Sequence, residues 1–455
     1  SSILELSRRR CNASPTPLRN QSIERTRVSA PRDMSSVSAD AVADLEDVAR
    51  RVYARAGRES TLAREATVDY LFGGLRSLPA GFTSLDASRA WMVYWCVHGL
   101  ALLDVDVASR DEALARDVVR FLRACRRRRG RRACFGFGGG PGQMPHVATT
   151  YAATCALVTI GTEEARETLV KEDVRAFLMS LKDETTGGFR VHDGGETDTR
   201  GCYAALATAH LCGVLDDELT RGVGAFVARC QSYEGGIAGE PLGEAHGGYT
   251  FCGLAACALA GSLDALDLGN LERWLANRQG EIEGGFNGRT NKLVDGCYSF
   301  WQGGCFPVLQ RSSETLLRQF SNRSAKALKV DADGAVDFDD SSRAIGVCAA
   351  TLYQPAEYPP GSPSPAPFAN GALQGWILDC CQSDNGAGGL RDKPGVGRDH
   401  YHTCYCLSGL SLAQHYGRCG VVEVVGPLES NTLAKVDPVV NVVQSKYDAW
   451  MSKQI

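Results

Sequence analysis

The sequence has no apolar run that approaches the roughly 18 residues of a transmembrane helix, so we expect no membrane-spanning segment. It also lacks a surplus of basic side chains, since 49 Lys and Arg stand against 53 Asp and Glu, a net charge of −4. Nucleic-acid binders normally carry a basic excess, so we expect no nucleic-acid partner. Among the 18 cysteines there is no CxxC pair, and Cys155, Cys252 and Cys257 lie in apolar stretches. Buried free thiols in a reducing compartment fit this pattern better than a secreted disulfide framework, and we predict a soluble, cytoplasmic protein.

Three segments differ in composition from the rest of the chain. Residues 1–40 are rich in Ser and Arg and lack the apolar centre of a secretory signal, so we expect a flexible N-terminal segment. The stretch from Arg123 to Arg132 holds seven arginines in ten positions. Such a block is typical of an inserted, solvated loop, with an anionic partner as the alternative. Residues 321–368 combine an acidic stretch with six prolines and are predicted to form a long surface insertion.

Glycine is over-represented, with 50 residues in 455, about 11% against roughly 7% in average proteins. Gly-Gly pairs recur at Gly138, Gly187, Gly235, Gly284 and Gly388, at intervals of 49, 48, 49 and 104 residues. A period of about 49 residues indicates an array of similar structural units. The longer last interval indicates one unit that carries the insertion at residues 321–368.

Each Gly-Gly pair is followed by a polar stretch and then by a tyrosine that opens an apolar run rich in small residues. These runs begin at Tyr151, Tyr203, Tyr249, Tyr298 and Tyr405. Amphipathic segments such as Glu163 to Leu181 and Leu271 to Arg278 alternate with them. A buried inner helix paired with an outer helix, repeated, predicts an all-α fold, an α/α toroid over residues 41–455 with inserted loops at about 123–133 and 321–368. We expect the Gly-Gly loops and the inner-helix N-termini to gather at one end, where they favour an anion.

Two of the segments before inner helices match each other, DGCY at residues 295–298 and HTCY at residues 402–405. In this alignment His402 takes the position of Asp295. Together Asp295, Cys297 and His402 would give zinc three ligands and leave a fourth position open, as catalytic sites do. A helix N-terminus at Cys297 would lower the pKa of its thiol and favour the ligating thiolate. A capping Asp and a buried Cys are the alternative on spacing alone.

Cationic groups and a phenol gather near the Gly-Gly loops and inner-helix starts. They are His246, Arg289, Lys292 and Tyr298. This combination suits a phosphate or diphosphate, with ordinary surface salt bridges as the alternative. Nearby glycines are expected to let the backbone approach the ligand. They are Gly247, Gly248, Gly284, Gly285 and Gly288.

Large aromatic side chains fall on the predicted inner helices. They are Trp91, Trp95, Tyr151, Tyr203, Tyr249 and Trp301. Trp91 and Trp95 are four residues apart and therefore share a helix face. A stripe of core residues is the ordinary explanation. In a barrel that also holds a diphosphate, the same rings would form a pocket for a long apolar tail.

Four ordered segments resemble the β subunits of protein farnesyltransferase. They are GGETDTRGCYAA at 194–205, EAHGGYTFCGLAA at 244–256, NKLVDGCYSFWQGG at 291–304 and GRDHYHTCYCLSGLSLAQH at 397–415. The resemblance runs from about Leu71 to Gly420, and the arginine loop and the insertion interrupt it. It implies a farnesyltransferase α subunit as heterodimer partner. It also implies transfer of farnesyl from farnesyl diphosphate to the cysteine of proteins with a C-terminal CaaX sequence.

The resemblance implies a role for each matching residue. Zinc, one per chain, would be held by Asp295, Cys297 and His402 and would bind the substrate cysteine as thiolate, and Asp392 matches a position proposed to hold Mg²⁺. The diphosphate would meet His246, Gly248, Arg289, Lys292 and Tyr298, of which Lys292 and Tyr298 stabilise charge on the leaving group. The isoprenoid would lie along Trp91, Tyr151, Arg200, Tyr203, Cys252 and Trp301. The end of the peptide would meet Ser88, Trp91, Trp95, Ala148 and Tyr401.

Three positions depart from the family pattern. Val396 replaces a common lysine, His400 a commonly aromatic neighbour of the peptide pocket, and Thr149 a proline beside it. The nearest alternative enzyme is a type I geranylgeranyltransferase β subunit, and the resemblance implies that Trp91 separates the two, because its indole would block a twenty-carbon tail. A catalytically inactive toroid that serves as a scaffold is the alternative of another class. The intact set of zinc ligands argues against it.

Overall fold

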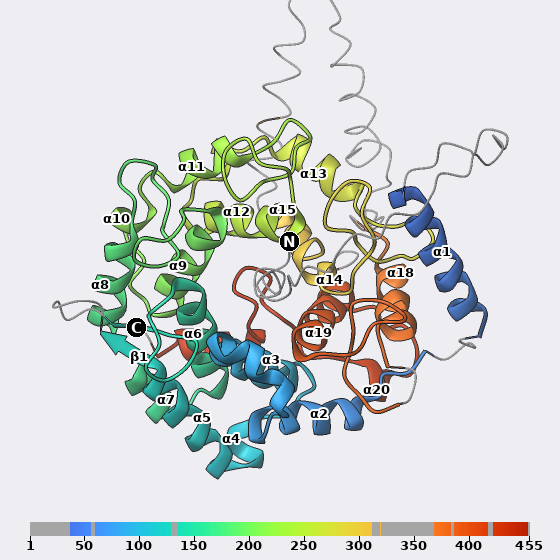
Figure 1. Ribbon diagram of the computed structural model, residues 1–455, viewed down its shortest axis with the longest axis horizontal. Coiled ribbons are helices and arrows are strands. Elements are labelled where there is room, and N and C mark those ends of the chain that lie inside the picture. Colours follow the sequence, from blue (N-terminus) through green and yellow to red (C-terminus); the bar gives the residue numbers. More distant parts are fainter. Residues whose placement is uncertain are drawn as a thin grey trace, which may run out of the picture.

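A ring of two concentric helical layers forms the architecture of this protein, seen in a computed structural model (Figure 1). The structure describes residues 37–55, 60–128, 135–311, 319, 368–383, 386–416 and 422–453. The chain follows the ring from α2 round to α19 in sequence order, and the ring closes where α19 packs against α3. The described helices confirm the predicted all-α toroid.

The inner layer is a closed ring in which each helix packs on the next. In chain order it consists of α3 (Arg89–Leu102), α6 (Val147–Ile160), α9 (Thr199–Leu211), α12 (Gly247–Leu259), α14 (Tyr298–Trp301) with α15 (Cys305–Arg311), and α19 (His400–His415). These helices are apolar on all sides: every residue of α6 except Ala148 is buried. Small side chains let the helices approach closely, which is why the apolar runs predicted the inner layer.

The outer layer covers the inner one with amphipathic helices. It consists of α2 (Arg64–Arg76), α5 (Glu112–Cys125), α8 (Lys171–Leu181), α11 (Val223–Cys230), α13 (Leu268–Ala276) and α18 (Asn370–Gly375). In α5 the buried residues Ala115, Val118, Val119 and Leu122 recur at three- and four-residue spacing, so one face of the helix is apolar.

Further elements precede, connect or follow the helices of the two layers. The helical ones are α1 (Val37–Arg55), η2 (Ala80–Ser88), α4 (Val107–Arg110), α7 (Glu163–Thr168), α10 (Asp217–Thr220), η3 (Leu263–Ala265), η4 (Trp376–Cys380), α20 (Leu428–Asn431) and α21 (Gln444–Met451). Two short strands, β1 (Arg126–Arg128) and β2 (Phe135–Phe137), pair antiparallel. Among the described helices, none combines the length and apolar character needed to cross a bilayer.

The Gly-Gly pairs turn the chain between an outer helix and the loop that follows it. Single antiparallel bridges close these turns: Lys182 with Phe189, Gln231 with Ile237, Gln279 with Phe286, and Gln382 with Leu390. Arg126 pairs with Phe137 in the same way. In the first repeat the equivalent dipeptide is therefore Phe135-Gly136, and the expectation that the pair beginning at Gly138 belongs to the repeat is wrong by three positions.

In the other four repeats, the first glycine of the pair lies against the backbone of the next outer helix. In one of them the contact is with the residue that caps this helix. A Cβ at Gly187, Gly235, Gly284 or Gly388 would lie 2.4, 2.2, 2.6 or 2.1 Å from the backbone of Gly222, Asn270, Ala372 or Ala66. All four glycines also have positive φ. Their role is to pack neighbouring outer helices. The expectation that Gly284 and Gly285 approach a ligand is therefore wrong, since Gly285 faces the Trp376 side chain.

Several predicted boundaries differ from the structure. Helix α1 begins at Val37, before the predicted start of the toroid at residue 41, and residues 1–36 lie outside the described part. In the arginine-rich stretch, Arg123 lies in the last turn of α5, and residues 126–128 form β1, in which Arg126 pairs with Asp173. Residues 129–134 of that stretch, and the predicted insertion apart from the buried Phe368, also lie outside the described part. The segment 163–181 is divided between α7 and α8.

The close approach of Gly284 to α18 yields a stability prediction. Gly284→Ala places a methyl group 2.6 Å from the Ala372 carbonyl oxygen at a φ of +76°. We expect a loss of about 2–4 kcal/mol in the free energy of unfolding. Gly371→Ala is the matched control, because Gly371 lies in α18 and a Cβ there has nothing within 4 Å. Urea unfolding followed by circular dichroism measures both variants, and equal stability of the two would contradict this role for Gly284.

Candidate active site

One backbone hydrogen bond sets where most inner helices begin. The N–H groups of His146, His246, Asp295 and Asp399 donate to the carbonyls of residues 137, 237, 286 and 390 at 3.1, 3.1, 3.1 and 3.2 Å. The accepting residues are the ones whose bridges close the turns. This register makes Asp295 equivalent to Asp399. The alignment that placed His402 at the position of Asp295 is therefore wrong, because His402 lies three residues further on.

These helix starts carry side chains that cap them. The side chains of His146, Asp198, His246 and Asp399 accept hydrogen bonds from backbone N–H groups in the first turns of α6, α9, α12 and α19. Asp295 does the same for the N–H of Cys297, at 2.8 Å. The rim is polar because helix N-termini there need acceptors.

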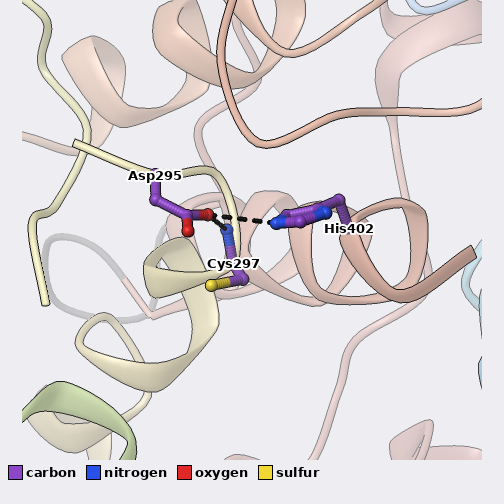
Figure 2. A group of neighbouring side chains, drawn as sticks. All are labelled: Asp295, Cys297 and His402. Carbon is purple, nitrogen blue, oxygen red and sulfur yellow. Dashed lines mark hydrogen bonds and ion pairs between the residues drawn. The ribbon is translucent and has the colours of Figure 1, made fainter. Parts of the chain in front are cut away.

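The structure brings together the three predicted zinc ligands. One ligand atom from each of Asp295, Cys297 and His402 lies within 4.8 Å of the other two. Figure 2 shows the three side chains converging from the segment just before α14 and from α19, with Nε2 of His402 3.3 Å from Oδ1 of Asp295. One carboxylate, one thiol and one imidazole in this arrangement fit a three-ligand zinc site. Among the described residues, no other group of three such side chains meets in this way.

Asp399 orients the imidazole of His402. One carboxylate oxygen of Asp399 caps α19 through the N–H of His402 at 2.7 Å, and the other lies 2.7 Å from Nδ1 of the same residue. Nε2 is thereby directed toward Asp295, the arrangement by which a carboxylate fixes a metal-binding histidine. Burial alone lowers the pKa of His402, but the hydrogen bonds to Asp295 and Asp399 outweigh it and raise the pKa well above its usual value.

The thiol of Cys297 does not behave as predicted from its position at a helix start. Burial, and then the charge of Asp295, raise the pKa of Cys297. The helix that follows, α14, has only four residues, so its dipole is too weak to oppose these effects. The expected lowering by the helix N-terminus is therefore wrong. A cation beside the sulfur is what would favour the thiolate here.

A second carboxyl group lies beside this cluster. Burial and the nearby charge of Asp295 raise the pKa of Asp392 to about 6, although Lys393 acts in the opposite direction. Oδ2 of Asp392 lies 2.5 Å from Nζ of Lys393. Within the described part of the chain, the buried Oδ1 of Asp392 has no hydrogen-bond partner. A buried, unpartnered carboxylate oxygen next to another carboxylate fits a cation.

The predicted anion-binding residues lie close to the metal ligands. The hydroxyl group of Tyr298 lies 2.9 Å from Nε2 of His246, while Nδ1 of His246 accepts from the N–H of Gly248 at 3.1 Å. Arg289 pairs with Glu244 at 2.9 Å on the rim. The N–H of Lys292, an exposed residue, donates to the carbonyl of Arg289, so both belong to one turn.

Glycines shape this part of the rim. A Cβ at Gly288 would overlap the ring of Tyr298, and one at Gly247 would meet Gln302. The N–H of Gly247 also donates to the carbonyl of Gly288 at 2.8 Å. These two glycines allow the loops to pack on each other.

Next to this polar rim lies a cavity of about 570 Å³. Every residue predicted to contact the isoprenoid lines it: Trp91, Tyr151, Arg200, Tyr203, Cys252 and Trp301. Of the predicted peptide contacts, Ser88 and Ala148 also line it, together with Thr149. The Arg200 guanidinium pairs with Asp198, at 2.5 Å, and with Glu196.

Three predicted aromatic contacts lie outside the cavity lining. Trp95 packs behind Trp91, with ring centroids 6.0 Å apart, and Tyr401 accepts a hydrogen bond from Nε1 of Trp301 at 3.0 Å. The ring of Tyr249 lies beside that of His246, with centroids 5.2 Å apart, and is not part of the cavity lining. Trp95 and Tyr401 therefore support the wall that the predicted ligand would touch.

Of the three departures from the family pattern, His400 and Val396 lie away from the cavity. The buried ring of His400 stacks on Tyr70, with centroids 4.3 Å apart. Val396 is on the rim, 41% exposed. Thr149 reaches the cavity lining, and its hydroxyl group donates to the carbonyl of Phe137 at 2.7 Å, so it fixes the start of α6.

Sequence reasoning missed a histidine pair on the cavity wall. His146 and His192 line the cavity with ring centroids 5.4 Å apart. Burial and the neighbouring His192 lower the pKa of His146 to about 4. The signal was present in the repeat, because His146 caps α6 as His246 caps α12. Alignment on the helix starts, instead of on the tyrosines, would have found it.

Comparison with known proteins agrees with this geometry. The family model of the prenyltransferase alpha-alpha toroid domain matches residues 62–442. The chain is 44% identical to protein farnesyltransferase subunit beta of Arabidopsis thaliana over 367 residues, which cover 78% of this chain and 73% of that protein. It is 42% identical to the protein of the same name from Pisum sativum over 405 residues, 84% of this chain and 92% of that one.

A solved structure shows the same fold. Candida albicans protein geranylgeranyltransferase-I complexed with GGPP matches with a TM-score of 0.61 over 87% of this chain and 100% of that one. At 19% identity this similarity is evidence for the fold alone. The family model and the relatives show more, and the chain belongs to the β-subunit family of the protein farnesyltransferases.

Proposed function

We propose that the chain is the catalytic β subunit of a protein farnesyltransferase. In this proposal it transfers the farnesyl group of farnesyl diphosphate to the cysteine of proteins that end in CaaX. The observation that carries it is the continuity between the apolar cavity and the metal-ligand cluster. Trp301 lines the cavity and donates to Tyr401, and Tyr401 also contacts the thiol of Cys297. A reacting carbon at the mouth of the cavity would therefore lie near a thiol held at the cluster.

The proposed reaction joins the substrate sulfur to C1 of the farnesyl chain and breaks the bond from C1 to the diphosphate oxygen. The thiol proton passes to solvent and diphosphate leaves. His246 and Tyr298 are hydrogen-bonded to each other at 2.9 Å, and we assign them to the leaving oxygens. Arg289 and Lys292 add positive charge on the adjacent turn. Groups aimed at developing negative charge stabilise the transition state.

Asp295, Cys297 and His402 would hold zinc, one ion per chain, with Asp399 orienting His402. When bound, zinc supplies positive charge that lowers the pKa of the substrate thiol. Asp392 would hold Mg²⁺ against the diphosphate, and its unpartnered Oδ1 supports this role. Neutralisation of two neighbouring carboxylates also offsets their mutual repulsion.

The proposal includes a partner and a compartment. We propose that the chain works as a heterodimer with a farnesyltransferase α subunit, as its relatives' designation as β subunits suggests. We also place the enzyme in the cytoplasm. Every cysteine in the part of the chain that the structure describes is free and buried, which suits a reducing compartment.

The metal role is tested by removing one ligand. Cys297→Ala in the heterodimer should lose zinc and reduce farnesyl transfer by more than the roughly 10–100-fold typical of losing an outer partner. Binding of farnesyl diphosphate should persist, because its proposed contacts lie elsewhere. Cys404→Ala is the matched control, since Cys404 is equally buried on α19 but is not a proposed ligand. Full transfer by a zinc-free Cys297→Ala enzyme would refute the mechanism.

The farnesyl assignment is tested at Trp91. This side chain lines the cavity and packs on Trp95 and Tyr151. Trp91→Thr should enlarge the cavity and allow the use of geranylgeranyl diphosphate, with a gain of about tenfold or more in kcat/KM for that donor. Rates of transfer from both labelled donors measure this. If the wild-type enzyme already prefers the longer donor, the farnesyl assignment is wrong and the geranylgeranyl alternative stands.

Metal uptake should depend on pH. The hydrogen bonds raise the pKa of His402. Protons therefore compete with zinc for this imidazole up to a higher pH than they would for a histidine with the usual pKa. The apparent zinc affinity should therefore rise with pH through the neutral range, and binding should release protons. Asp399→Asn weakens one of these hydrogen bonds and should shift the dependence to lower pH. Calorimetry in buffers of different ionisation enthalpy counts the protons, and a pH-independent affinity would contradict the assignment.

A further inference from the structure

Three tyrosines of the inner ring donate to three consecutive carbonyls of the C-terminal segment. The hydroxyl groups of Tyr203, Tyr151 and Tyr94 donate to the carbonyls of residues 439, 440 and 441 at 2.9, 3.0 and 2.7 Å. The tyrosines belong to α9, α6 and α3, which are neighbours in the ring. In Figure 1 the red C-terminal segment loops into the middle of the ring, where these helices meet it.

The accepting carbonyls belong to a tightly bonded turn, residues 437–442, which we call the carbonyl turn. Oδ1 of Asp437 accepts from the N–H groups of Val439 and Val440 at 2.9 and 3.1 Å. The N–H of Asn441 donates to the carbonyl of Asp437 at 3.0 Å, and the N–H of Asp437 donates to the carbonyl of Val442 at 2.8 Å. Asn441 has a φ of +50°, and its Oδ1 lies 3.1 Å from Nε2 of His98. These bonds fix the backbone of the turn that carries the three carbonyls.

The carbonyl turn does not line the cavity, but two of the tyrosines that it holds do. Tyr151 and Tyr203 belong to the lining, whereas the fully buried Tyr94 does not. The hydroxyl groups of Tyr151 and Tyr203 are also 3.0 Å apart. Displacement of either ring would break its hydrogen bond to the turn, which carries a desolvation cost, and the carbonyl of Val440 would keep the more distant thiol of Cys155 at 3.8 Å. The turn therefore restrains this part of the cavity wall from behind.

We propose that the carbonyl turn sets the depth of the cavity, and with it the length of prenyl chain that fits, by holding Tyr151 and Tyr203 in place. This inference rests on the proposed function, because it takes the cavity as the prenyl site. Asp437 is a positioning residue in this proposal, since it does not line the cavity and acts on it through the turn. Its Oδ2 also pairs with Arg311 of α15 at 3.4 Å. The selectivity against a longer chain then depends on a hydrogen-bonded segment that the chain itself does not touch.

The test compares donors in the heterodimer. Asp437→Ala removes the acceptor that holds the turn, and Asp437→Asn keeps an oxygen at the same place and serves as the conservative rescue. The double variant Tyr151→Phe with Tyr203→Phe keeps both rings and removes their bonds to the turn. Tyr94→Phe is the matched control, because it removes an equal bond to the same turn from outside the cavity.

The readout is the ratio of kcat/KM for geranylgeranyl diphosphate to that for farnesyl diphosphate. Asp437→Ala and the double variant should raise this ratio by about 3–10-fold, the size of one hydrogen bond. Asp437→Asn and Tyr94→Phe should change it less than about twofold, and KM for the peptide should stay constant in all variants. If Asp437→Ala does not give a folded heterodimer, the single variant Tyr203→Phe takes its place.

The outcomes separate this inference from the proposed function. An active wild-type enzyme with the same donor ratio in the double variant overturns the inference alone. An equal shift in Tyr94→Phe also overturns it, because the effect would then be general loosening. A wild-type heterodimer that transfers neither prenyl group overturns the proposed function and this inference together.

Discussion

The hydrogen bond between a turn-closing residue and the residue just before an inner helix, found at four of the repeats, is the constraint on which the rest of the structure depends. It fixes the height at which α6, α12 and α19 begin, and it places Asp295 at the same height before α14. Helix N-termini then share one end of the ring, and their N–H groups require acceptors. The capping side chains His146, Asp198, His246 and Asp399 supply them. A polar rim above an apolar interior follows from this register alone.

Two of the capping carboxylates serve both the fold and the proposed chemistry. Asp399 caps α19 with one oxygen and orients His402 with the other. Asp295 accepts from the N–H of Cys297 and still presents an oxygen to His402. A cap fixes the position of its own side chain, because the side chain is hydrogen-bonded to the backbone of the helix start. Ligands built on caps are therefore preorganised, which a metal site needs.

Part of this arrangement could be predicted from the sequence. The repeat and the apolar runs were enough for the two-layer ring. The cluster of Asp295, Cys297 and His402 was found from residue type and from the family resemblance, although the alignment of His402 with Asp295 was wrong by three residues. The pKa of Cys297 could not be predicted, because it depends on burial by loops that are distant in sequence. The carbonyl turn could not be predicted either, since its hydrogen bonds to the tyrosines join residues 236 to 347 positions apart. The Gly-Gly signal was real, but its cause was helix packing and not ligand contact.

The proposed donor combines a charged diphosphate with a long apolar chain. The toroid offers groups for the two parts at different depths along its inner helices. At the rim, helix N-termini, His246 and Tyr298 offer polar contacts. One or two helical turns deeper, the side chains of Tyr151, Tyr203 and Trp301 offer only ring faces, because their polar atoms are directed elsewhere. Those of the two tyrosines point to the carbonyl turn, and that of Trp301 points to Tyr401. Because these polar atoms are satisfied behind the wall, this part of the cavity wall is apolar. A phenol without such a partner would turn toward the cavity and make it a poorer site for a hydrocarbon chain.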